Sequence, residues 1–321
     1  MIIKDKVYGK ERIHERILLD LLSSKSFERL KGISQFGMPD EYYHRKNFSR
    51  YEHSIGVFVL LRKLGADLEE QVAGLLHDVS HTAFSHVIDW VIGDPTKEDY
   101  QDSIHQKIIR DSDIPKILTN HGLNYKSISN LEKFSLLERE PPHLCADRID
   151  YTLRELEMER GKIFTQNLFC DLKNIDGQIV FMHKNTAKIF ATEYIRLQKE
   201  HWGGDQARAR FYVLSNVLTK ALNSKILSTE DFKKTDYEVL NKLNSSRNKE
   251  ILKDLNLLKR ELDVQESKNG IELKNKFRHI DPEIFLNESI IKLSEISKEY
   301  KRILDFERNN SQNFKKVEIK E

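Results

Sequence analysis

Four side chains that can bind a metal ion constrain this chain more than any other feature. His77 and Asp78 are adjacent, His53 precedes them, and Asp147 follows them. Two imidazoles and two carboxylates can hold one divalent ion if the fold brings them together, and such ligands suit Mn, Fe, Co, Ni or Zn better than Mg. An apolar stretch before His77 predicts a buried helix that ends in this polar pair. A lone His-Asp pair is usually a surface dipeptide, so the prediction depends on all four residues.

Histidines are concentrated in the same part of the chain. Six of the twelve lie between positions 44 and 105: His44, His53, His77, His81, His86 and His105. His86 and Asp89 are three residues apart, a spacing that places both on one face of a helix. A carboxylate in that position fixes the tautomer of an imidazole and raises its proton affinity, which suits acid–base chemistry. The alternative is that each histidine is an ordinary core or surface residue.

These motifs resemble the HD-domain phosphohydrolase superfamily, whose signature is H…HD…D. The runs 26–37, 47–57, 77–89 and 147–151 are similar to one subgroup, the deoxynucleoside triphosphate triphosphohydrolases, which includes the sterile-alpha-motif/HD enzyme. The resemblance covers about residues 5–160. It implies a mostly helical metal-dependent phosphohydrolase that holds one divalent metal per chain. The metal ligands that it implies are His53, His77, Asp78 and Asp147.

The resemblance also implies roles for further residues. The catalytic candidates around the phosphate are His81, His86, Asp89 and His105. The substrate-binding candidates are Gln35, Arg50, Arg148, Tyr151 and Glu155, the last at a position where the family usually has an aspartate. For Arg50 and Arg148 the alternative is an ordinary ion pair on a helix surface.

Regulation and assembly are expected to differ from the controlled members of the subgroup. Those enzymes bind a guanine activator through an aspartate, a glutamine and an arginine, and the corresponding positions here are Ser23, Glu28 and Lys31. We therefore expect no activation by a guanine nucleotide. The resemblance implies a homo-oligomer, and the short chain indicates reduced tetramer-forming elements.

Composition indicates a soluble globular protein of the cytoplasm. The chain has 321 residues, 39% hydrophobic and 32% charged, with a net charge of +2. Two cysteines, Cys145 and Cys170, provide no disulfide framework. No apolar run has the length of a signal peptide or a membrane span, so no membrane association is expected. The pairs Lys233-Lys234 and Lys315-Lys316 allow nucleic-acid binding, but a solvated helix face or tail explains them more simply.

Helical periodicity predicts a mostly α fold, with an HD-type helical core, small β-hairpins and a smaller α+β region at the C-terminal end. We expect a catalytic domain over 1–223 and the smaller region over 224–321, with a frayed polar tail from Asn309. Expected helices cover 52–64, 68–80, 98–110, 186–200, 205–223 and 295–306, and another runs from Pro141-Pro142 to about Arg160. Asp176-Gly177 and Asn269-Gly270 predict hairpins.

The resulting hypothesis is metal-assisted hydrolysis of a nucleotide, most specifically dNTP to deoxynucleoside plus triphosphate. The same ligands would serve an HD-type phosphomonoesterase or phosphodiesterase acting on another nucleotide. A different class of protein, a non-catalytic HD module that binds nucleotides or nucleic acid, is the other alternative.

Overall fold

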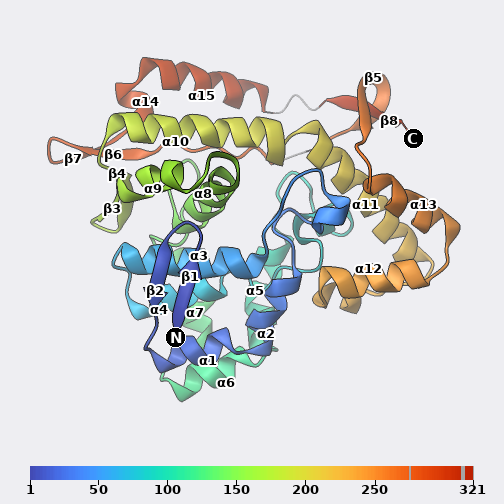
Figure 1. Cartoon of the computed structure of the whole chain (residues 1–321), viewed down its shortest axis with the longest axis horizontal. Helices are drawn as coiled ribbons and strands as arrows, with labels where there is room; N and C mark the ends of the chain where they lie inside the picture. Colours follow the sequence, from blue (N-terminus) through green and yellow to red (C-terminus); the bar gives the residue numbers. More distant parts are fainter. Residues whose placement is uncertain (275, 312–314, 321) are drawn as a thin grey trace.

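Helices make up most of the structure, a computed structural model that describes residues 1–274, 276–311 and 315–320 (Figure 1). Two helices, α3 (Arg50–Lys63) and α8 (Ala146–Arg160), carry His53 and Asp147, and His77 and Asp78 directly follow α4 (Leu68–Leu76). The other helices before α8 are α1 (Arg16–Leu22), α2 (Lys25–Glu28), α5 (Tyr100–Arg110), α6 (Ile114–Asn120) and α7 (Tyr125–Ile128).

A capping box fixes the start of α3. The Ser49 hydroxyl accepts a hydrogen bond from the backbone N–H of Glu52 at 3.2 Å, and the Glu52 carboxylate accepts one from the backbone N–H of Ser49 at 2.9 Å. These contacts satisfy donors that the first turn of a helix leaves free. Most of α3 is buried on every side, as expected for a central helix. His53 is therefore held in the interior of the protein.

The helix before His77 is shorter than predicted. α4 ends at Leu76, His77 is its C-terminal cap, and Asp78 lies in the turn that follows. The prediction for α8 was wrong at its start. Pro141 and Pro142 lie in a turn and are joined by a cis peptide bond, and the helix begins at Ala146 after the extended residue Cys145.

The second half of the chain adds helices and a small mixed sheet. The helices are α9 (Lys162–Cys170), α10 (Lys184–Leu197), α11 (Asp205–Asn223), α12 (Asp236–Ser245), α13 (Lys249–Leu258), α14 (Leu293–Ile296) and α15 (Lys298–Asn310). The predicted hairpin at Asp176-Gly177 is confirmed, since β3 (Leu172–Ile175) pairs with β4 (Gln178–Phe181). β6 (Glu283–Leu286) runs parallel to β4, and β7 (Ser289–Lys292) completes the sheet.

Asn269-Gly270 does not form the predicted hairpin. The segment belongs to one strand, β5 (Asp263–Glu272), which pairs with β8 (Lys316–Lys320). Glu266 and Ile271 both lie opposite Val317, so the residues between them form a bulge. A side chain at Gly270 would come within 2.2 Å of the Val317 carbonyl oxygen. The expected frayed tail is wrong for β8, while residues 312–314 and 321 lie outside the described residues.

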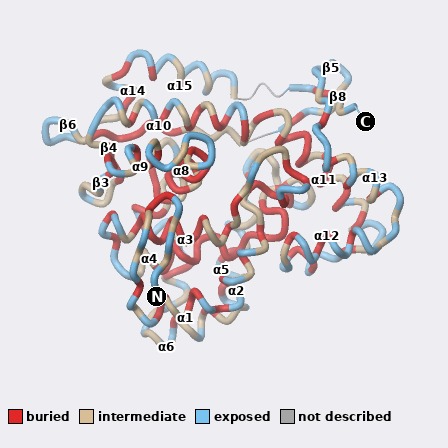
Figure 2. Tube along the Cα trace, in the orientation of Figure 1, coloured by how far each residue is buried: buried red, intermediate tan, exposed pale blue. Residues whose placement is uncertain are grey.

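Two further features bear on the division of the chain. The N-terminal strands β1 (Ile2–Asp5) and β2 (Gly9–Arg12) form a hairpin that was not expected from the sequence. Hydrophobic clusters continue across residue 223: one joins α3, α4 and α8 to Ile280 and Leu304, and another joins Phe84 to Leu240. Buried stretches lie on both sides of this boundary, in α11 before it and in α13 after it (Figure 2). The boundary at 223/224 stays a prediction. No helix among the described residues is long and apolar enough to cross a membrane.

Candidate metal centre and its cleft

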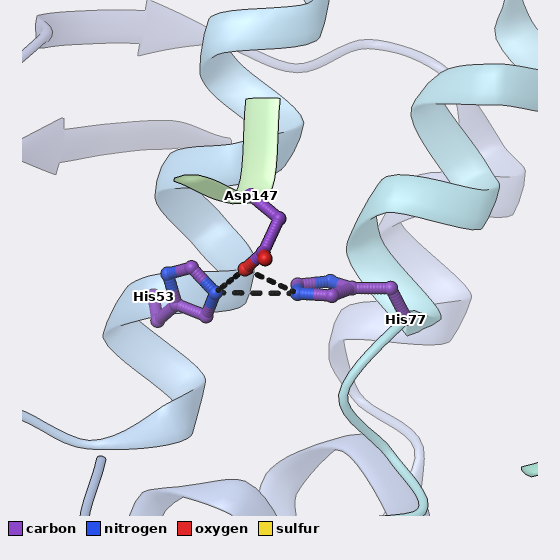
Figure 3. A group of neighbouring side chains, drawn as sticks. All are labelled: His53, His77 and Asp147. Atoms are coloured by element: carbon purple, nitrogen blue, oxygen red, sulfur yellow. Dashed lines mark hydrogen bonds and ion pairs between the residues drawn. The ribbon is translucent and has the colours of Figure 1, made fainter. Parts of the chain in front are cut away.

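His53, His77 and Asp147 converge from α3, the end of α4 and the first turn of α8 (Figure 3). Nε2 of His53 lies 3.2 Å from Nε2 of His77 and 2.9 Å from Oδ1 of Asp147. Nε2 of His77 lies 3.7 Å from the same carboxylate oxygen. Three donor atoms facing one another at these distances can surround one ion.

Asp78 adds a fourth candidate ligand beside this group. Its Oδ1 lies 3.5 Å from Nε2 of His77, and its Oδ2 lies 3.7 Å from Nε2 of His53. Arg50 donates a hydrogen bond from Nη1 to Oδ2 at 2.9 Å. Burial raises the pKa of Asp78, but the charges of Arg50 and His77 outweigh it and hold the pKa well below its ordinary value. Asp78 is therefore an ionised carboxylate, as ligation requires.

The tautomers of both histidines fit a divalent metal. Nδ1 of His77 lies 2.8 Å from the Gly74 carbonyl oxygen, which can only accept, so Nδ1 carries the proton. Nδ1 of His53 lies 2.7 Å from the carboxylate of Asp150 and donates to it. Both Nε2 atoms face Asp147. Burial lowers the pKa of His77, but Asp78 and Asp147 outweigh it and raise the pKa to about 9, so Nε2 would offer its lone pair once a metal displaces this proton. Neutral imidazoles oriented by a hydrogen bond at the other ring nitrogen are the usual form of histidine ligands.

A buried chain of charges extends from His53 to the N-terminal hairpin. Asp150 accepts a second hydrogen bond, from Nε of Arg154 at 2.7 Å, and Nη2 of Arg154 contacts Asp5 at 2.6 Å. Gly56 on α3 leaves room for these groups, because a Cβ there would lie 1.9 Å from Arg154 Nη2 and 2.0 Å from Asp150 Oδ1. The orientation of His53 thus depends on residues from three separate segments.

Two further histidines lie next to the four candidate ligands His53, His77, Asp78 and Asp147, which together are called the metal cluster here. Nε2 of His81 is 3.2 Å from Oδ1 of Asp78, and the rings of His81 and His86 are 5.0 Å apart and nearly perpendicular. Nδ1 of His86 lies 3.4 Å from Oδ2 of Asp89. Burial lowers the pKa of His86 and lowers that of His81 to about 4, while burial raises the pKa of Asp89 to about 7. At neutral pH both imidazoles are neutral.

The cluster opens into a cavity of about 420 Å³. The predicted site residues that line it are Gln35, Arg50, His77, Asp78, His81, His86, Asp147, Arg148 and Tyr151. His53 and Asp89 lie behind this wall and contact its residues. His105 is buried against the Ser80 hydroxyl and does not line the cavity.

Glu155 also lies outside the cavity wall, which it supports from behind. Its carboxylate accepts hydrogen bonds from Nδ1 of His201, at 2.5 Å, and from the indole of Trp202. Trp202 packs edge-to-face on Tyr151 and Tyr194, and the hydroxyls of these two tyrosines lie 2.5 Å apart. The result is an aromatic wall beside the metal cluster. Sequence reasoning missed Tyr194 and Trp202, which carry no motif.

Arg148 faces both the cavity and a second acidic group. It donates to Glu138 at 3.0 Å and to the sulfur of Cys145 at 2.9 Å. Glu138, Cys145 and Asp147 also lie close enough together to hold an ion. Because the guanidinium of Arg148 already occupies the first two, His53, His77 and Asp147 form the better metal site.

Comparison with known proteins shows the family of the chain. A model of the HD domain matches residues 50–152. The Bacillus subtilis protein YdhJ is 38% identical over 94% of this chain and 94% of its own. The metal-dependent phosphohydrolase cns2 of Cordyceps militaris is 32% identical over 89% of this chain and 85% of its own. The chain belongs to the HD-domain metal-dependent phosphohydrolases.

One solved structure and a further curated protein are also similar to this chain. The crystal structure of the Bacteroides thetaiotaomicron phosphohydrolase BT4208 has a TM-score of 0.71 at 18% identity, with 93% of this chain and 95% of that chain covered, and it shares the fold. A Dictyostelium discoideum protein named a deoxynucleoside triphosphate triphosphohydrolase SAMHD1 homolog is 24% identical over 80% of this chain and 57% of its own.

Proposed function

We propose that this HD phosphohydrolase hydrolyses dNTPs to deoxynucleoside and triphosphate. The observation that carries the proposal is the composition of the cavity wall. It combines a metal cluster, the guanidinium groups of Arg50 and Arg148, and the aromatic face of Tyr151. Guanidinium groups suit phosphate oxygens, and an aromatic face suits a sugar or base. The similarity to the Dictyostelium triphosphohydrolase homolog supports this choice of substrate.

The predicted site residues have distinct chemical roles in this proposal. His53, His77, Asp78 and Asp147 would hold one divalent ion, which when bound supplies Lewis-acid polarisation and an activated water. Arg50 sits against Asp78 and balances negative charge that develops on the phosphoryl oxygens. Neutral His86, oriented by Asp89, can accept a proton at its free ring nitrogen and return it to the leaving oxygen. His81 completes the polar wall between them.

The same wall would serve an HD-type phosphomonoesterase or phosphodiesterase on another nucleotide, and this is the second candidate. Its support is the metal cluster alone, because the same ligands would serve hydrolysis at any of the phosphorus–oxygen bonds. A homo-oligomeric assembly is a further part of the proposal, and light scattering on the purified chain tests it.

Separation of the products from a nucleotide panel tests the proposal. With Mn²⁺ or Mg²⁺, we expect deoxynucleoside and intact triphosphate from dNTPs, without any requirement for GTP or dGTP. Release of orthophosphate alone would favour the second candidate. Strict dependence on a guanine nucleotide would contradict the altered activator positions Ser23, Glu28 and Lys31.

A further inference from the structure

A segment far from the HD motifs closes one side of the cavity. Residues 276–279 connect the β5–β8 pair to the strand β6, and all four of them line the cavity that the metal cluster faces. They include two cations, Lys276 and Arg278. The guanidinium of Arg278 interacts electrostatically with Tyr151 and Tyr194 on the aromatic wall. The same group contacts Glu98, which also lines the cavity.

Glu98 holds two arginines together inside this wall. It is 1% exposed, accepts a hydrogen bond from Nη1 of Arg208 at 2.8 Å, and contacts Nη2 of Arg278. Burial raises the pKa of Glu98, but the guanidinium groups of Arg278 and Arg208 outweigh it and hold the pKa well below its ordinary value. One carboxylate thus faces two permanent cations. These three side chains together carry one more positive than negative charge, in a buried place where a charge without a counter-charge is costly.

Several polar atoms of the wall have no partner within the described residues. Nη2 of Arg208, Oε1 of Gln35 and Nδ1 of His279 are buried and make no hydrogen bond there. Arg208 is 1% exposed and is packed between the rings of Trp90 and Phe211, so its guanidinium cannot turn to solvent. Lys276 forms no ion pair with any residue that the structure describes. Buried polar groups are nearly always satisfied by protein or by ordered water, so unsatisfied ones in a cavity wall are positions where water or a polar ligand can bind.

We propose that Arg208, Arg278 and Lys276 form a subsite for a phosphate group of the nucleotide other than the one beside the metal cluster. This deepens the proposed function and rests on it for the identity of the substrate. A planar guanidinium with a free N–H matches phosphate oxygens. The ammonium of Lys276 adds a further cation to the wall, and its charge also acts on the carboxyl groups of Asp102 and Asp89. His86 links the two regions, because its ring lies 5.0 Å from that of His81 and it lines the same cavity as Glu98 and Arg278. The subsite makes a chain of phosphates the preferred ligand.

Binding of inorganic triphosphate and of orthophosphate to the purified chain tests the subsite without any turnover. The variants are Lys276→Ala and Arg278→Gln, and the control is Lys301→Ala, which removes an exposed charge on α15. Because a charge-assisted contact is lost, calorimetry should show triphosphate binding weakened about tenfold or more in each variant. Orthophosphate binding should change little, and the control should match the wild type.

Two results would overturn the subsite. One is a Kd for triphosphate that stays within about twofold of the wild-type value in both variants, in place of the expected tenfold increase. The other is an equal loss of affinity for orthophosphate and for triphosphate. That result would mean that the cations act through the overall positive potential of the cavity and do not form a second phosphate site. Lys276→Ala keeps the test decisive if Arg278→Gln unfolds, since Lys276 has no ion pair to lose among the described residues.

Failure of the subsite and failure of the proposed function remain distinguishable. If no nucleotide is hydrolysed but triphosphate binding depends on Lys276 and Arg278, the subsite stands and the activity is wrong. If dNTPs are hydrolysed and neither variant raises KM, the activity stands and the subsite is wrong. Where both hold, Lys276→Ala should raise KM for dNTPs about tenfold with little loss of kcat, since it removes binding energy only.

Discussion

Nδ1 of His53 donates a hydrogen bond to Asp150 across 2.7 Å, and both side chains are completely buried. We predict that Asp150→Asn weakens metal binding, because the amide lacks the charge that orients the imidazole and balances Arg154. Substitution of such partners typically costs about 10–100-fold in metal affinity. Competition with a fluorescent chelator measures this directly.

A matched control for this variant is Asp176→Asn, in the exposed turn of the β3–β4 hairpin. It should keep wild-type metal affinity. Equal metal affinity in Asp150→Asn and the control, with the fold intact by circular dichroism, would show that the buried charge chain does not position His53.

Removal of a metal ligand should empty the site. We predict that His77→Ala and Asp147→Ala lose the bound ion, since each deletes one of the three donors that face one another. Elemental analysis of purified protein measures the metal content per chain. His14→Ala, which removes an exposed histidine, should retain the metal. Full occupancy in both ligand variants would disprove the assignment.

Residues beside the cluster should affect turnover and leave metal content unchanged. We predict that His86→Ala and Asp89→Asn keep the ion but lose about 10²–10⁴-fold in kcat, the usual contribution of general acid–base groups. The pair to measure is kcat together with metal content. Wild-type kcat in both variants on the true substrate would exclude them from proton transfer.

A buried carboxylate links α12 to the site and should make stability depend on pH. Asp236 accepts hydrogen bonds from the backbone N–H groups of Ser34 and Phe84, each at 2.8 Å. Burial raises its pKa to about 6, against the opposing effect of those bonds and of Arg29. A carboxyl whose pKa is raised by folding stabilises the protein below the pKa of the unfolded chain, and this stabilisation is lost as pH rises through 6.

Asp236→Asn removes this titration. The difference in the free energy of unfolding, variant minus wild type, should therefore increase by up to about 3 kcal/mol from pH 4 to pH 7. Urea denaturation of both proteins at a series of pH values gives the difference. A difference that stays constant over this range would mean that Asp236 ionises equally in the folded and unfolded chain.

Local signals account for what the sequence predicted well. His53, His77, Asp78 and Asp147 lie in short motifs, and the helices beside them follow from apolar periodicity, while their convergence was implied by the resemblance to the HD superfamily. The helix over 205–223 and the hairpin at Asp176-Gly177 likewise depend on neighbouring residues. Such features need no knowledge of distant partners.

Features set by distant partners could not be predicted in the same way. Asn269-Gly270 has the composition of a tight turn, but pairing of β5 with β8 places it in a bulge against Val317. Residues 276–279 carry no motif, and only the path of the chain brings them to the cavity. The role of Arg208 could not be predicted either, because its hydrogen-bond partner Glu98 lies 110 positions away in the sequence.

Because residues 276–279 lie in a connecting segment, metal binding and substrate contact depend on different parts of the chain, which evolution can change independently. The candidate ligands His53 and Asp147 belong to helices, and His77 and Asp78 directly follow one, in the packed core, where most substitutions disturb the fold. The opposite wall of the cavity comes from a connecting segment, and connecting segments tolerate replacement more readily. A descendant of this protein could therefore acquire a new substrate by exchanging a few residues there, while inheriting its hydrolytic chemistry unchanged.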